Sequence, residues 1–93
     1  MTKLKKLYYI VDKGEYGQGR AVSLGFSKKG CVMAEYTNEP EYFDTYKEVC
    51  EFLRKVKKSV FDYSFGTGYE IKNQYIKRRN LRIERDVFEL DEE

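Results

Sequence analysis

Hydrophobic and polar residues follow a helical period over residues 45–60. At 100° per residue, the apolar and aromatic side chains of this stretch fall within an arc of about 160°. They are Tyr46, Val49, Cys50, Phe52, Leu53, Val56 and Val60. Thr45 with Glu48 three residues later has the spacing of a capping box, and Asp44 is the alternative N-cap. The pattern predicts one amphipathic helix that packs a single face on the rest of the chain.

The chain before this helix has the alternation of antiparallel strands. Residues 4–11 predict a first strand, and residues 20–26 predict a second. Ser27–Gly30 suits a type I turn with Gly30 in the left-handed conformation, which leads into a third strand. This turn sets the cross-strand pairs Phe26–Val32, Leu24–Ala34 and Val22–Tyr36 on one face. In the first strand, Leu7, Tyr9 and Val11 share a face.

The chain after the helix predicts two more strands, over residues 69–76 and 81–88, joined as a hairpin with 76–80 at its tip. Its expected pairs are Tyr75–Leu81, Asn73–Ile83 and Tyr69–Val87. The alternative is a single helix through 70–88, although its apolar spacing is poorer. Residues 61–68 fit either a short strand or a loop, and the acidic residues 89–93 are expected to fray.

These elements predict an α+β fold in one domain of residues 1–93, a length that suits one domain and not two. We expect an antiparallel sheet of four to six strands with the helix packed on one face, in the order β-β-β-α-(β)-β-β. The apolar face of the helix is then occupied by the sheet, so a functional site is expected on the far sheet face or at the basic hairpin tip.

The composition offers little for catalysis. The chain has no histidine, which is the commonest general base. The glycines of residues 14–19 do not have the spacing of a phosphate-binding loop. We therefore expect no enzyme, no cofactor, no metal site and no small-molecule substrate. No stretch approaches the ~20 apolar residues of a membrane span, and no secretory signal is evident. We expect a cytoplasmic protein without membrane contact, with Cys31 and Cys50 reduced.

Charge is segregated near the end of the chain. Residues 72–85 hold six basic residues against Glu84, whereas residues 86–93 hold five acidic residues and no basic one. Cations next to tyrosine and amide side chains are typical of nucleic-acid surfaces. The candidate binding surface consists of Lys72, Tyr75, Lys77, Arg78, Arg79, Arg82 and Arg85. The alternative is that these charges are solvated, or oppose the acidic end within the chain or across a dimer.

Nine tyrosines are many for this length. Tyrosine is favoured at protein interfaces, and also in half-buried strands. The first expectation is therefore a small binding or regulatory protein that acts through protein–protein contacts with an unknown partner or with itself as a homodimer. Nucleic-acid binding through residues 72–85 is the alternative. Heavy use of Lys and Tyr in a short chain is also typical of AT-rich bacteria and their phages, which suggests a phage or mobile-element origin.

Overall fold

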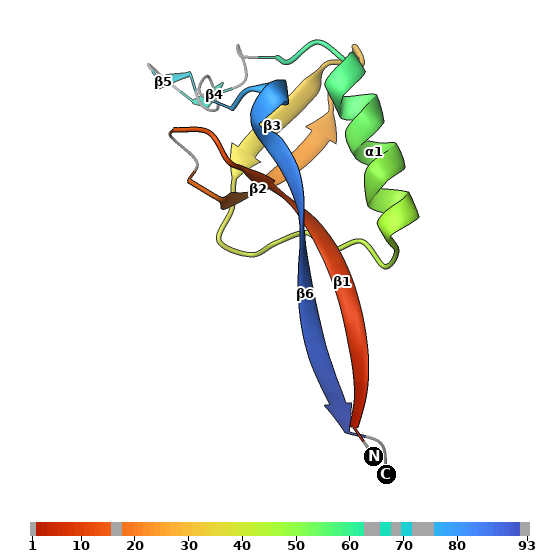
Figure 1. Ribbon diagram of the computed structural model, residues 1–93. Helices are drawn as coiled ribbons and strands as arrows, with labels where there is room; N and C mark the ends of the chain where they lie inside the picture. Colours follow the sequence, from red (N-terminus) through yellow and green to blue (C-terminus); the bar gives the residue numbers. More distant parts are fainter. Residues whose placement is uncertain (1, 16–17, 63–65, 68–69, 72–75, 92–93) are drawn as a thin grey trace.

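The computed structural model describes residues 2–15, 18–62, 66–67, 70–71 and 76–91 (Figure 1). Its elements in chain order are β1 (Thr2–Asp12), β2 (Arg20–Phe26), β3 (Val32–Tyr36), α1 (Tyr46–Lys58), β4 (Gly66–Thr67), β5 (Glu70–Ile71), the 3₁₀ turn η1 (Arg78–Asn80) and β6 (Leu81–Asp91). A four-stranded antiparallel sheet has the order β3-β2-β1-β6, and β4 pairs separately with β5. The predicted α+β fold, an antiparallel sheet with one helix, is confirmed.

The β2–β3 hairpin has the predicted register. Phe26 pairs with Val32, Leu24 with Ala34 and Val22 with Tyr36. Gly30 has a φ of +82°, and its N–H donates to the Ser27 carbonyl at 2.9 Å. Because only glycine adopts this conformation without strain, the turn residue fixes the register of both strands.

Helix α1 begins where the capping pattern places it. Thr45 is the N-cap, and its Oγ1 accepts a hydrogen bond from the Glu48 backbone N–H at 3.1 Å. Val49, Leu53 and Val56 are buried, as predicted. Val60 is exposed instead, because the helix ends at Lys58 and the chain becomes extended at Ser59.

The core lies between α1 and one face of the sheet. Its buried members are Ile10, Val22, Val32, Ala34, Val49, Leu53, Val56, Ile76 and Leu81. From β1, Ile10 and Tyr8 face this core, so Leu7, Tyr9 and Val11 share the opposite face. We call the two sides of the β1–β6 pair the helix side and the open side.

Strand β6 pairs with β1 over its whole length, which corrects the predicted hairpin. Leu81 lies opposite Asp12 and Val87 opposite Lys6, instead of opposite Tyr75 and Tyr69. Strand β1 offers an eleven-residue partner, whereas the segment 69–76 is shorter. Tyr69, Asn73 and Tyr75 lie outside the described residues.

The alternative helix through 70–88 is wrong for residues 81–88, which are strand. Residues 89–91, where the sequence predicts a frayed end, are part of β6, in which Thr2 pairs with Asp91. Residues 92 and 93 lie outside the described part. Between α1 and β4, Phe61 forms a single parallel bridge with Val32.

The β1–β6 pair extends far beyond the body of the protein (Figure 1). Strand β1 pairs with β2 only at Val11 and Asp12, and forms one further bridge from Tyr8 to Phe43. From Leu7 back to Thr2, β1 pairs only with β6, and the two strands form a projecting ribbon that ends at the Thr2–Asp91 pair. The radius of gyration is 14.9 Å, against about 12 Å for a compact domain of this length.

Candidate functional site

The predicted basic surface is divided between different faces of the molecule. Arg82 lies opposite Val11 and Arg85 opposite Tyr8. Side chains three residues apart in a strand point to opposite faces. Arg82 is therefore on the open side, and Arg85 is on the helix side. Lys72 and Tyr75 lie outside the described residues.

Two of these arginines are bound to backbone carbonyls. The Arg78 guanidinium donates to the carbonyls of Lys57 and Ser59, both at 3.3 Å, at the C-terminal end of α1. The Arg82 guanidinium donates to the carbonyls of Arg79 and Leu81 at 2.7 and 2.8 Å. These contacts attach η1 to the helix and to β6, so the two cations have structural roles.

The protruding end of the ribbon combines charge and apolar surface in a regular way. We define the distal ribbon as residues 3–7 of β1 and 86–90 of β6. Each of its cross-strand pairs joins one charged and one apolar residue. The pairs are Lys3–Leu90, Leu4–Glu89, Lys5–Phe88, Lys6–Val87 and Leu7–Asp86. Each side of the distal ribbon carries both apolar and charged side chains. A strand face that is exposed only to solvent is normally polar, so neither side has that composition.

Four large apolar side chains of the distal ribbon are solvent-exposed. The exposed fractions are 59% for Leu4, 47% for Val87, 37% for Phe88 and 43% for Leu90. Leu4 and Val87 lie on the helix side, and Phe88 and Leu90 lie on the open side. Single exposed apolar residues are ordinary on protein surfaces, but exposed apolar residues on both sides of a projecting element favour an interaction surface.

An aromatic cluster covers the base of the distal ribbon on its open side. The Tyr42 ring meets Tyr9 and Phe88 edge-on, with ring centroids 5.6 Å apart in both cases. The Tyr42 hydroxyl donates to Asp86 Oδ2 at 2.7 Å. This hydrogen bond, with some burial, raises the pKa of Tyr42 to about 12. The cluster fixes the segment before α1 against β6.

A groove of about 530 Å³ lies on the ribbon where it meets α1. Its lining residues are Tyr8, Tyr46, Ile83, Glu84 and Arg85. The rings of Tyr8 and Tyr46 are 5.5 Å apart. Tyr46 was expected to be buried in the apolar face of the helix, but its side chain remains exposed at this groove.

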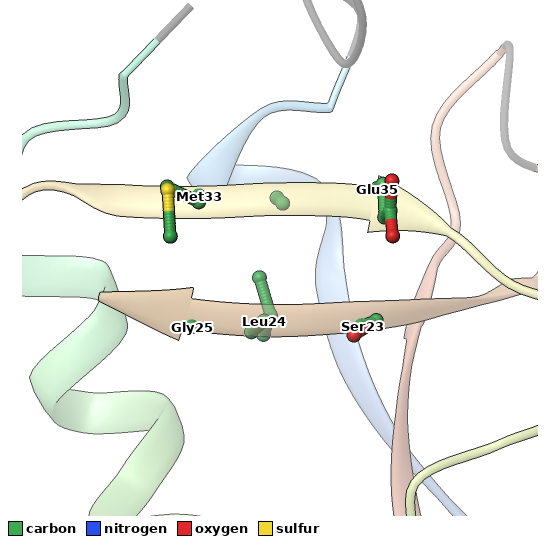
Figure 2. Close-up of a pocket in the computed structure, with 6 residues that line it drawn as sticks. Ser23, Leu24, Gly25, Met33 and Glu35 are labelled. Atoms are coloured by element: carbon green, nitrogen blue, oxygen red, sulfur yellow. The ribbon is translucent and has the colours of Figure 1, made fainter. Parts of the chain in front are cut away.

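The far face of the β2–β3 hairpin carries a shallow hollow of about 160 Å³. Met33 and Glu35 line it from β3, and Ser23 and Gly25 line it from β2 (Figure 2). No atom lies within 4 Å of the position that a Gly25 side chain would take. At the edge of this hollow, Ser23 Oγ donates to Glu41 Oε1 at 2.6 Å in an exposed position.

Asp12 is a fully buried carboxylate at the base of the ribbon. Its Oδ1 accepts the Gly14 N–H at 2.8 Å, and its Oδ2 accepts the Tyr36 hydroxyl at 2.7 Å. Burial and the bond to Asp12 raise the pKa of Tyr36. Both oxygens are therefore engaged in joining β1, β3 and the following turn, and Asp12 is a structural residue.

The described residues contain no group of three or more potential metal ligands. Cys31 and Cys50 are both free and half-buried. Within the same part of the chain, no helix has the length and apolar character needed to cross a bilayer.

The sequence does carry a signal for the distal ribbon. The segments LKKL (residues 4–7) and DVFEL (residues 86–90) both mix apolar and charged residues on each side of a strand. The predicted strand ends at Phe88 and the predicted frayed end begins at Glu89, so the sequence pattern does not join Phe88 and Leu90 into one surface.

Comparisons of the chain with protein families, with curated proteins and with solved structures found no match.

Proposed function

We propose that this chain is a small binding or regulatory protein, without enzymatic activity, that acts through protein–protein contacts made by the distal ribbon. The observation that carries the proposal is the exposure of Leu4, Val87, Phe88 and Leu90 on a projecting two-stranded element.

The stability of the ribbon supports a partner. A two-stranded ribbon in water is marginally stable, and three or more strands or a covering helix are usually required. Among the described residues, no third strand or helix pairs with residues 3–6 and 87–90, and the Tyr42 ring covers this part only at Phe88. A partner that covers the ribbon would bury apolar surface that is otherwise hydrated.

The charges of the ribbon support the same proposal. Lys3, Lys5, Lys6 and Glu89 have no ion-pair partner within the described residues, and all four are exposed. Free charges of both signs beside apolar groups are suited to electrostatic complementarity with another protein surface.

The arginine contacts favour protein over nucleic acid as the partner. A phosphate-binding surface requires cations that reach one continuous face. Arg78 and Arg82 bind backbone carbonyls, and Arg85 lies on the other side of β6 from Arg82. The acidic residues Asp86 and Glu89 follow Arg85 in β6.

Site-specific photo-cross-linking in the native cell tests the proposal. A photoreactive phenylalanine analogue replaces Phe88 in one variant and Val60 in a matched control. Val60 is also apolar and is 70% exposed, but it lies after α1, where its carbonyl accepts from the Val32 N–H of β3. We expect cross-linked protein from position 88 and none from position 60. Equal yields at both positions, or none at 88, would contradict the proposal.

A further inference from the structure

We propose that the partner of the distal ribbon is a second copy of this chain, and that the two copies pair antiparallel through their β6 edges around a two-fold axis at Val87. This inference rests on the proposed function and identifies its partner. The contact joins the two sheets into one, with both helices on the same face.

The directions of the backbone groups show which edge is open. The N–H and C=O of Tyr8 bond to Phe43 at 3.0 and 2.7 Å, so they point away from β6. The Asp12 carbonyl likewise points toward β2, where it accepts from the Gly19 N–H at 2.7 Å. These directions alternate along a strand, so every second residue of β1 points its N–H and C=O away from β6. The β6 residues opposite Tyr8, Lys6 and Leu4 must then point theirs away from β1. The N–H and C=O groups of Arg85, Val87 and Glu89 therefore lie at the outer edge of β6.

The outer edge of β6 is long and has no neighbouring strand in the described sheet. Outward groups run from Ile83 to Asp91, which spans roughly 30 Å at the usual rise of a strand. Natural proteins protect such edges with proline, bulges or charged side chains. β6 contains no proline, and its ladder with β1 is continuous over every residue. It does carry charged residues of both signs, so pairing at this edge requires a register in which opposite charges meet. An edge of this kind is a template for pairing with another strand.

The charge pattern selects the register. Two strands pair only if residues whose N–H and C=O groups point toward the partner lie opposite residues of the same kind. Centring the pairing on Val87 places Val87 opposite its own copy, and Arg85 opposite Glu89 of the second copy. The symmetry repeats the Arg85–Glu89 pair on the other side of the axis. Centring on Arg85, Asp86 or Glu89 would instead oppose like charges. Centring on Phe88 would place Glu89 opposite Val87, so Glu89 would have no opposite charge across the contact.

The open edge of β1 is a poorer candidate. Only Thr2, Leu4 and Lys6 present free outward groups, because Tyr8 is already bonded to Phe43. Pairing β1 of one copy with β6 of the next is a heterologous contact, which continues from copy to copy into a ring or a filament and does not close as a dimer. Pairing β6 with β6 uses the longer edge and closes as a dimer.

A proline substitution tests the edge without disturbing the ladder inside the chain. The Val87 N–H points outward, so Val87→Pro removes a donor that β1 does not use. We expect sedimentation equilibrium to show a dimer of the 11.1 kDa chain for the wild type. We expect the dimer Kd of Val87→Pro to rise about tenfold or more. The control Val87→Ala keeps the N–H and should change the Kd much less.

Charge reversal tests the register. Arg85→Glu and Glu89→Arg, each alone, place like charges opposite one another twice per dimer. We expect either variant to raise the Kd about tenfold or more. The double variant Arg85→Glu/Glu89→Arg restores opposite charges, and we expect it to recover most of the wild-type affinity. Circular dichroism checks that each variant is folded.

The possible outcomes separate this inference from the proposed function. A wild-type chain that remains monomeric at all concentrations overturns self-pairing, while cross-links from position 88 to another protein would still support the proposed function. A dimer that Val87→Pro leaves unchanged overturns the β6 edge as the contact. A double charge variant that remains monomeric overturns the Val87-centred register.

Discussion

At the scale of single residues, several side chains with chemical potential have structural tasks. The buried carboxylate of Asp12 receives hydrogen bonds from Gly14 and Tyr36. Arg78 binds the end of α1. These residue types suggest catalysis or phosphate binding in a sequence, but the geometry shows that their polar atoms already have partners.

The Tyr42–Asp86 hydrogen bond gives a prediction for base titration. Because the pKa of Tyr42 is raised from 10.0 to about 12 in the folded chain, the bond contributes stability below pH 10 and loses it as the pH rises through 12. In Asp86→Asn the charged acceptor is gone, and we expect the Tyr42 pKa to fall toward 10. NMR of the Tyr42 ring carbons measures both values. An unchanged pKa in Asp86→Asn would contradict the assignment.

The Arg78 contacts predict a difference between neighbouring arginines. Arg78→Ala removes two hydrogen bonds to the carbonyls at the end of α1 and a cation from the negative end of the helix dipole. We expect it to lower the free energy of unfolding by about 1 kcal/mol.

Arg79→Ala is the matched control, since the Arg79 side chain is exposed and forms no hydrogen bond or ion pair with any described residue. Urea denaturation measures both variants. Equal effects of the two substitutions would show that the Arg78 contacts do not stabilise the fold.

At the scale of elements, the sequence predicted local structure well and distant pairing badly. The β2–β3 register follows from one turn residue, Gly30, and from alternation on either side of it. The partner of β6 is instead the strand at the other end of the chain. Consecutive strands pair more often than not, so segment 69–76 was the natural expectation. No local pattern in the sequence indicates that β6 pairs with β1 and not with segment 69–76.

The sequence also does not indicate which side of β1 faces the helix. Tyr8 and Ile10 are apolar, and so are Leu7, Tyr9 and Val11 on the other side. Alternation predicts that each set shares a side, but it does not indicate which side meets the helix. The candidate site was limited for a similar reason. The arginines are evident from composition, whereas the surface of the distal ribbon depends on the β1–β6 pairing, which the sequence pattern does not indicate.

The β2–β3 hairpin predicts opposite effects of alanine at two glycines. Gly30 has a positive φ, so Gly30→Ala should lower the free energy of unfolding by about 1 kcal/mol. Gly25 lies within β2, has no positive φ, and has open space at its Cβ position. Gly25→Ala should therefore raise that free energy by about 0.5 kcal/mol. Thermal unfolding of both variants checks the sign, and a shared sign would contradict the account.

At the scale of the whole molecule, the protein consists of a packed body and a projecting ribbon. Its longest extent is 52 Å, against 23 and 22 Å in the other two directions. The body buries its apolar residues between α1 and the sheet, and so resembles any small stable domain. The ribbon exposes apolar and charged residues together, so the distal ribbon is the part of the molecule where we place the function.

Residue-resolved amide exchange over a range of protein concentrations tests most directly whether two copies pair through the β6 edge of this ribbon. The amides of Asp86 and Phe88 point toward β1, whereas those of Arg85, Val87 and Glu89 point outward. We predict that the outward amides exchange fast in dilute solution and become protected as the concentration rises, until they match Asp86 and Phe88. Outward amides that exchange fast at every concentration would contradict pairing through the β6 edge.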